Sequence, residues 1–434
     1  MERLLINDLV VWKNKYNRKP LIIQGARQVG KTWIMKEFGK RSFKNTVYIN
    51  FDNNPRMKTV FEQDYDIKRI ISALKIEHGC NFEAEDTLLI FDEIQEVPKA
   101  LSSLKYFCEE APEYAIVAAG SLLGIALHQG TSFPVGKVEF MQLYPLNFRE
   151  FLMAMGEEQL AGLLWNQDES LINAFSGKYI DYLRKYYYVG GMPEVVQCFA
   201  DTDDYFAVRE IQNGLLKYYE EDFSKHAPKE VVPRIQMVWN SLPAQLAKEN
   251  RKFIYGIIRE GARAKDFELA IQWLLDCGLV HKSYRIAKPD IPLIAYAEMK
   301  SFKMFLSDVG LLAAKGSIPA KLLLEGNSIF EEFKGALTEQ FVAQELVSLG
   351  KELYYYSAEN SSGEIDFVIQ QSMYCIPIEV KAEENLRAKS LRAFCERYTP
   401  EIALRSSMTN FREQDWMKNV PLYALAYYLV QIDK

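Results

Sequence analysis

One stretch of eight residues has the types and spacing needed to bind a nucleoside triphosphate. It matches the pattern GxxxxGK[ST] in full and reads Gly25-Ala26-Arg27-Gln28-Val29-Gly30-Lys31-Thr32. The glycines let backbone N–H groups turn inward around a β-phosphate, Lys31 reaches the β- and γ-phosphate oxygens, and Thr32 ligates Mg²⁺. We expect all eight residues to line a site for ATP with magnesium, and we call them the P-loop.

Two acidic residues downstream could complete this site. Asp92 and Glu93 directly follow the apolar run 88–91. We expect Asp92 to hold the magnesium shell and Glu93 to orient the attacking water, so that Glu93 and Lys31 are catalytic. A solvated strand end is the alternative interpretation of the acidic pair, and the complete P-loop upstream favours the catalytic one.

The elements around these residues indicate an α/β fold. Helical spacing over 33–38 follows the P-loop directly. Strands separated by helix-length segments predict a parallel sheet with helices on both faces, here for a P-loop ATPase domain at 1–155. The β-prone apolar runs that support this prediction are 21–24, 46–51, 87–91 and 114–119.

After Tyr144-Pro145-Leu146 the alternation stops. We expect a helical lid at 156–225, with helices interrupted at 189–193, and a winged-helix-like domain at 226–300, where helix patterns precede the β-prone run 279–286. The remaining segment, 301–434, is expected to be a third, α/β domain. Its long helix pattern covers 330–349, and its β-prone runs are 352–357, 364–370 and 374–380.

Composition limits the classes of function. The formal net charge of −6 supplies no overall attraction to nucleic acid, so DNA binding would depend on local basic patches.

The six cysteines form no CxxC pair, which favours reduced thiols over a zinc site. The short apolar stretch near the start is interrupted by Asn7 and Asp8, which fits neither a signal peptide nor a membrane span. We therefore expect a cytoplasmic protein without membrane contact.

Several motifs together resemble a family of prokaryotic AAA-type ATPases with a C-terminal restriction-nuclease-like domain of unknown function. They are the P-loop, LIFDEIQ (89–95), AGSLL (119–123), LYPLNFREF (143–151), VGGMPE (189–194), SDVGL (307–311) and the segments 363–367 and 377–381. The resemblance implies an ATPase that uses ATP and Mg²⁺. It also implies a catalytic role for Ser121 in sensing the γ-phosphate, with a plain turn serine as the alternative. Trp33 departs from the small or β-branched residue more usual in similar proteins.

The resemblance also implies an arginine that stabilises the transferred phosphoryl group. Arg149, Arg184 and Arg209 lie in the right general region. The sequence does not single one of them out, and a surface or ion-pair arginine is the alternative for each.

A second constellation lies near the C-terminus. Glu364-Ile365-Asp366 and Glu379-Val380-Lys381 resemble the D…ExK pattern of restriction-type nucleases, and Glu339 matches the additional acid of the family. A hairpin turning at 371–373 would bring Asp366 nearly opposite Glu379, with Lys381 on the same face. Glu339, Asp366 and Glu379 would then hold a second metal ion for phosphodiester hydrolysis, with Lys381 positioning the nucleophile. A cross-strand Glu–Lys pair on a half-exposed hairpin is the alternative.

Two basic groups could contact DNA. They are Arg387, Lys389, Arg392 and Arg397 near the C-terminus, and Arg251, Lys252, Arg259, Arg263 and Lys265 in the middle segment. The alternative for the group near the C-terminus is a solvated helix face, and the alternative for the middle group is a mostly core helix in a domain that serves only as a lid. The leading hypothesis is an ATPase whose nucleotide state controls a nuclease-like domain directed to double-stranded DNA. The alternative is a nucleotide-dependent signalling or interaction switch with a catalytically inactive docking domain, whose partner is another protein or a second copy of the chain.

Overall fold

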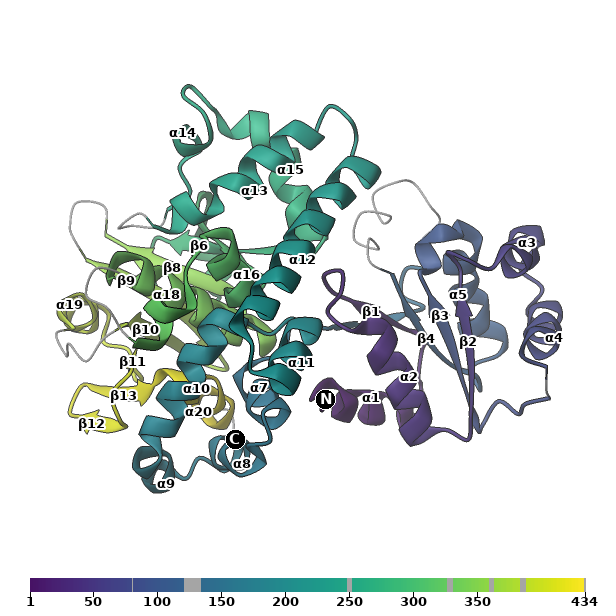
Figure 1. Cartoon of the computed structure of the whole chain (residues 1–434), viewed down its shortest axis with the longest axis horizontal. Coiled ribbons are helices and arrows are strands. Elements are labelled where there is room, and N and C mark those ends of the chain that lie inside the picture. The colour runs from purple at the N-terminus through teal and green to yellow at the C-terminus, as the bar shows by residue number, and fades with distance from the viewer. Residues whose placement is uncertain are drawn as a thin grey trace. The chain divides into compact units, whose positions relative to one another are not determined.

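The structure, a computed structural model, describes residues 1–79, 81–120, 134–247, 252–325, 331–358, 363–382 and 388–432 (Figure 1). The chain divides into two compact units. The N-terminal unit comprises Glu2–Tyr144 with Trp273–Leu279, and the C-terminal unit comprises Met1, Pro145–Gln272 and Val280–Lys434. Within the described residues, no helix is both long enough and apolar enough to cross a membrane.

A five-stranded parallel sheet forms the centre of the N-terminal unit. The order across the sheet is β2 (Asn45–Asn50), β3 (Thr87–Asp92), β4 (Ala115–Ala119), β1 (Leu21–Gln24) and β5 (Glu139–Gln142). The four predicted strands and their parallel arrangement are confirmed. The fifth strand, β5, was not predicted. It is a short edge strand in which Phe140 is 45% exposed, and it lacks the apolar run of a central strand.

Helices cover both faces of this sheet (Figure 1). Side chains of α3, α4 and α5 pack with Val47 and Leu89 in one core. Gly39 of α2 lies against Thr46, the residue before Val47, so α2 covers the opposite face because side chains alternate along a strand. Among the described residues from 2 to 144, the helices are α1 (Leu5–Lys13), α2 (Lys31–Ser42), α3 (Pro55–Gln63), α4 (Ile67–His78), the 3₁₀ helix η1 (Ile94–Glu96) and α5 (Pro98–Glu110).

The C-terminal unit begins with helices, as predicted. Their interruption at Gly190-Gly191 has a local cause: Gly190 has a φ of +74°, and Pro193 starts the next helix. The helices of this stretch are α7 (Phe148–Ala154), α8 (Glu158–Asn166), α9 (Glu169–Ala174), α10 (Ser176–Val189), α11 (Pro193–Thr202), α12 (Tyr205–His226), α13 (Val232–Leu246), α14 (Tyr255–Ile258) and α15 (Ala264–Asp276).

An eight-stranded mixed sheet follows. Its order is β12 (Arg412–Gln414), β13 (Met417–Pro421), β11 (Leu404–Ser407), β10 (Tyr374–Val380), β9 (Glu364–Gln371), β8 (Leu353–Ser357), β6 (Val280–Ile286) and β7 (Ala297–Leu306). The accompanying helices are the 3₁₀ helices η2 (Leu293–Tyr296) and η4 (Leu422–Ala424), with α16 (Val309–Lys315), α17 (Ala320–Glu325), α18 (Glu331–Ser348), α19 (Lys389–Tyr398) and α20 (Leu425–Ile432).

Strand pairing in this sheet joins segments that the sequence analysis assigned to separate domains. The strand β6 pairs with β7 and also with β8. A single sheet therefore spans the domain boundary that was predicted between residues 300 and 301. Local patterns showed that 279–286 is a strand, but they carried no information on which strand it would pair with. A winged-helix-like domain and a restriction-nuclease-like domain are therefore not confirmed, and the four-segment division stays a prediction.

Candidate functional site

The P-loop connects β1 to α2 in the N-terminal unit. Gly25 has a φ of +150°, and a Cβ at that position would lie 2.2 Å from the backbone oxygen of Leu143. Gly30, with a φ of +95°, is the N-cap of α2, and no side chain caps this helix end. The loop therefore needs glycine at both positions, and the first N–H groups of α2 are directed towards an anion site.

Lys31 is held by the loop that precedes it. Its Nζ donates hydrogen bonds of 2.9 Å to the backbone oxygens of Gly25 and of Ala26. Burial lowers the pKa of Lys31 to about 8, although the charges of Glu93 and Asp92 act in the opposite direction. The ammonium group therefore lies inside the loop, where phosphate oxygens would replace the two carbonyls as its partners.

Thr32 and Asp92 meet although 60 positions separate them. The Thr32 hydroxyl donates a 2.6 Å hydrogen bond to Oδ2 of Asp92, and the Tyr48 hydroxyl donates to the same oxygen at 2.9 Å. The backbone N–H of Glu93 donates to the other oxygen, Oδ1, at 3.1 Å. A hydroxyl and a carboxylate side by side are the oxygen ligands that Mg²⁺ prefers, so these residues fit the predicted metal.

Sequence reasoning missed Tyr48. The alternation of polar and apolar residues along β2 was visible in the sequence, but the pairing of β2 with β3 was not. Burial and the nearby Asp92 charge raise the pKa of Tyr48 above its ordinary value, so the hydroxyl remains a hydrogen-bond donor.

Glu93 has an unusual backbone and a fixed side chain. Its φ of 50° places it in the left-handed region, which is uncommon outside glycine. The Gln95 amide donates a 2.7 Å hydrogen bond to Oε2 of Glu93. Gln95, which sequence reasoning did not assign a role, therefore orients the predicted catalytic acid. Ser121, the other predicted catalytic residue, lies outside the described residues.

The predicted hairpin near the C-terminus is confirmed. Tyr374 pairs with Gln371, so the turn is shorter than expected and consists of residues 372 and 373. The pairing of Ile378 with Phe367 brings Glu379 next to Asp366. Burial raises the pKa of Glu379, and the Asp366 charge adds to the shift.

Each carboxylate of this hairpin already has a partner. Lys381 Nζ lies 2.8 Å from Oε1 of Glu379. Oδ2 of Asp366 accepts a 2.7 Å hydrogen bond from the backbone N–H of Val380. The structure thus brings Asp366, Glu379 and Lys381 together as expected.

Glu339 does not join them. Its Oε2 lies 3.6 Å from Nζ of Lys303, which is fully buried and also lies 2.5 Å from Oε1 of Glu364. Among the residues that the structure describes, no group of three or more His, Cys, Asp or Glu is arranged to hold a metal ion. The convergence of Glu339 with Asp366 and Glu379 is therefore a prediction that the geometry does not support.

Side-chain alternation explains this separation. Lys303 and Phe305 share one face of the sheet, and the Phe305 ring lies 5.7 Å from that of Phe367, which pairs with Ile378. Glu379 follows Ile378 in the strand and therefore points to the other face. The sequence pattern contained all three acids, but it did not show which face of the sheet α18 would cover.

Two further buried carboxylates were missed. Asp308 accepts hydrogen bonds from the backbone N–H groups of Gly191 at 2.6 Å and Leu311 at 2.9 Å. Glu345 accepts one from the N–H of Phe148 at 2.8 Å. Burial raises the pKa of Asp308 to about 6 and that of Glu345 to about 8. The VGGMPE, SDVGL and LYPLNFREF motifs thus meet in the core of the C-terminal unit, where they serve the fold.

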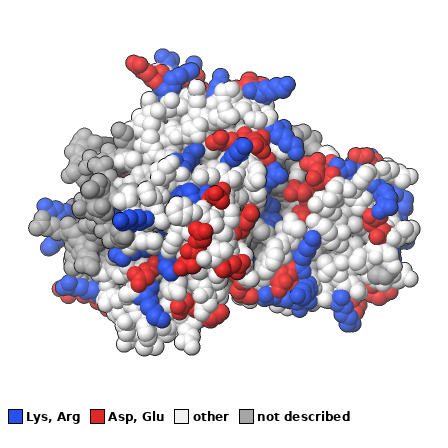
Figure 2. All heavy atoms as spheres, viewed as in Figure 1, with Lys and Arg blue, Asp and Glu red and all other residues white. Residues whose placement is uncertain are grey.

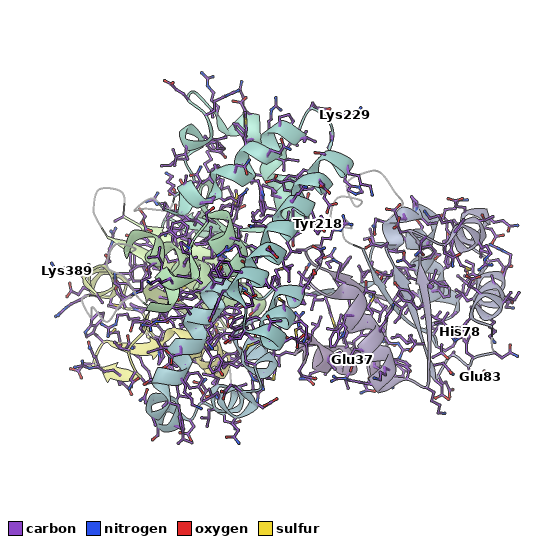
Figure 3. The ribbon with its side chains drawn as sticks, in the orientation of Figure 1. Glu37, His78, Glu83, Tyr218, Lys229 and Lys389 are labelled. Carbon is purple, nitrogen blue, oxygen red and sulfur yellow. The ribbon has the colours of Figure 1, made fainter. Side chains whose placement is uncertain are left out.

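The basic residues proposed for DNA binding are only partly available. Lys389 is exposed at the start of α19 and extends outward in Figure 3. Arg392 pairs with Glu396, and Arg397 donates to the Tyr356 hydroxyl. Arg387 and Arg251 lie outside the described residues, whereas the other four basic residues of the middle segment are exposed: Lys252, Arg259, Arg263 and Lys265. Basic and acidic side chains are interspersed over the face of the molecule that Figure 2 shows.

Two of the three arginines considered for phosphoryl stabilisation are engaged inside the C-terminal unit. Arg149 donates to the backbone oxygen of Ala161 and lies over the Trp165 ring. Arg209 donates to the backbone oxygen of Ile318 and to the Tyr188 hydroxyl. These contacts assign Arg149 and Arg209 a structural role in the unit to which they belong.

Comparisons with solved structures gave matches of low similarity. The Walker-type ATPase of Pyrococcus abyssi is 13% identical over 73% of this chain and 95% of its own, with a TM-score of 0.45. The Aeropyrum pernix ORC1 protein in complex with DNA is 14% identical over 73% and 91%, with a TM-score of 0.26. Cdc6p from Pyrobaculum aerophilum is 11% identical over 75% and 95%, with a TM-score of 0.25. No curated protein matches the chain.

Family models match three segments. Residues 180–321 match a domain of unknown function (DUF8612), and residues 334–425 match another (DUF4143). Residues 17–152 match the model of an AAA domain, and this segment contains the whole P-loop together with Asp92 and Glu93. The N-terminal unit thus carries an AAA-type P-loop domain.

Proposed function

We propose that the chain binds ATP with magnesium at the P-loop and hydrolyses it. The meeting of Thr32 Oγ1 and Asp92 Oδ2 at 2.6 Å, directly beside the P-loop, is the observation that supports this function most. Thr32 and Asp92 would hold the metal, which when bound neutralises phosphate charge. Lys31 exchanges its two carbonyl partners for phosphate oxygens, and Glu93, held by Gln95, orients the attacking water.

We further propose that the C-terminal unit is a docking module and that the nucleotide state of the P-loop domain controls it. The carboxylates of this unit support that choice over a metal site. Glu339 and Glu364 share the buried Lys303, and Glu379 pairs with Lys381, so each of these three carboxylates already has a cation of the chain beside it. The occupant of the module is then a protein or a second copy of the chain.

DNA-directed cleavage is a second candidate. It is favoured by one observation, the adjacency of Asp366 and Glu379 with Lys381 2.8 Å from Glu379. Two carboxylates and a lysine at a strand pair are the minimum for metal-assisted hydrolysis of a phosphodiester. The exposed Lys389, Arg259, Arg263 and Lys265 would contact the DNA backbone.

One set of assays tests both candidates. ATP hydrolysis is measured for the full chain, for Lys31→Ala and for Lys44→Ala, whose side chain is 76% exposed in the same unit. We expect Lys31→Ala to reduce hydrolysis about 10²- to 10³-fold and Lys44→Ala to match the wild type. Unchanged hydrolysis in Lys31→Ala would show that the nucleotide site is wrongly assigned.

The same reactions are repeated with double-stranded DNA and Mn²⁺. Nicking that persists in Lys31→Ala but disappears in Glu379→Gln would establish the second candidate. Intact DNA and an unchanged rate of ATP hydrolysis would leave docking as the function of the C-terminal unit.

A further inference from the structure

Arg3 lies far from the P-loop in sequence but contacts it in space. The residue is buried, with 5% of its surface exposed. Its Nη1 donates a 3.0 Å hydrogen bond to the backbone oxygen of Val29, and its Nη2 donates a 2.6 Å bond to the backbone oxygen of Tyr144. One guanidinium group therefore bridges the P-loop and the segment that follows β5.

The bond to Val29 determines the direction of a neighbouring N–H group. The Val29–Gly30 peptide is planar and trans, so its C=O and N–H point in opposite directions. Because Arg3 holds the Val29 oxygen, the Gly30 N–H is directed away from Arg3. Gly30 is the N-cap of α2, and its N–H belongs to the set that the P-loop presents to phosphate.

The bond to Tyr144 reaches the point where the chain leaves the N-terminal unit. The preceding residue is also attached to the P-loop strand, since the Leu143 N–H donates to the Gln24 oxygen at 2.8 Å. The chain continues into the C-terminal unit, where the Leu146 N–H donates to the Gly191 oxygen at 2.7 Å and the Phe148 N–H to Glu345. Backbone groups are thus fixed on both sides of the junction.

We propose that Arg3 is a positioning residue of the nucleotide site, which orients the Gly30 N–H for phosphate and ties the P-loop to the junction at Tyr144. This inference rests on the proposed ATP site. Arg3 touches no phosphate itself and acts through the loop backbone. Its guanidinium suits the task because two parallel donors can bridge two carbonyl oxygens, which a single ammonium group does less well.

The test compares Arg3→Met, which keeps an unbranched stem but lacks the guanidinium group and its donors, with Arg3→Lys. Arg18→Met is the matched control, because Arg18 also bridges two backbone oxygens of the N-terminal unit, those of Lys13 and Glu113, away from the P-loop. The KM for ATP, kcat and the thermal unfolding temperature are measured with the full chain. We expect Arg3→Met to raise the KM about tenfold, Arg3→Lys to raise it less, and Arg18→Met to leave it unchanged.

The outcomes distinguish a positioning role of Arg3 from a role that only stabilises the fold. A stabilising role alone would lower the amount of active protein, and hence the apparent kcat, at an unchanged KM. An unchanged KM in Arg3→Met would therefore overturn the proposal. If Arg3→Met does not fold, Arg3→Lys decides, with a raised KM in favour and a wild-type KM against.

A failure of the proposed ATPase function can be distinguished from a failure of the role proposed for Arg3. If the proposed function is wrong, the wild-type chain neither binds nor hydrolyses ATP. An active wild type, an inactive Lys31→Ala and a wild-type KM in Arg3→Met would instead refute only the role of Arg3.

Discussion

Acidic residues have different partners in the two units. Asp92 of the N-terminal unit accepts hydrogen bonds from hydroxyl and backbone N–H groups, whereas the nearby Lys31 donates to the carbonyls of Gly25 and Ala26. In the C-terminal unit, Glu339 and Glu364 surround the ammonium group of Lys303, and Glu379 pairs with Lys381. The type of partner, more than the number of carboxylates, therefore distinguishes a site prepared for a ligand from carboxylates that already have a lysine beside them.

The largest effect is expected from removing the buried cation. Lys303→Ala leaves Glu339, which is 3% exposed, without its positive neighbour, and the free energy of unfolding should fall by about 3–5 kcal/mol. Urea denaturation measures the loss, with Lys389→Ala at the exposed start of α19 as the control. A loss below about 1 kcal/mol, close to that of an exposed ion pair, would show that Lys303 does not balance these charges.

A pH effect of intermediate size is expected from Glu345. Its pKa is raised from an ordinary 4.5 to about 8 by burial, with smaller effects from its neighbours. Between these values the folded chain binds more protons than the unfolded chain, so stability falls as pH rises, by at most about 1.4 kcal/mol per pH unit. The charged and titratable groups around Glu345 are Glu150, Asp308, Tyr186 and Tyr427.

Glu345→Gln isolates this contribution. The variant keeps an acceptor for the Phe148 N–H and cannot titrate. Asp308, whose pKa is raised to about 6, accounts for a slope only below that pH. The dependence between pH 6 and 8, measured by chemical denaturation, should therefore flatten in Glu345→Gln, and an unaltered slope would exclude Glu345 as its source.

The smallest effect concerns Gln95. Gln95→Ala removes the donor that holds Oε2 of Glu93, so we expect kcat for ATP hydrolysis to fall about tenfold, with stability unchanged. Glu96→Ala, an exposed neighbour in η1, is the matched control. Equal rates in the two variants would mean that Glu93 needs no orienting partner, and the contrast between the units would then rest on Asp92 alone.

Prediction from sequence succeeded where structure depends on neighbours in the chain. The P-loop follows β1 directly, and Asp92 ends β3, so one strand and one turn place each residue at the carboxyl edge of a parallel sheet. The hairpin of β9 and β10 was predictable for the same reason, because a short turn determines its register. Arg3 and Tyr48 belong to no motif that linked them to this site, and Gln95 lies within LIFDEIQ (89–95) but had no assigned role.

Residue types and their spacing were enough to identify the available chemistry: an anion-binding loop, an acidic pair at a strand end, and acids and lysines near the C-terminus. Which of these groups meet depends on the tertiary fold. Strand order put β2 beside β3 and so brought Tyr48 to Asp92, whereas the packing of α18 brought Glu339 to Lys303 and away from Glu379. Such pairings depend on contacts between distant segments, which alternation along one strand or the period of one helix does not encode.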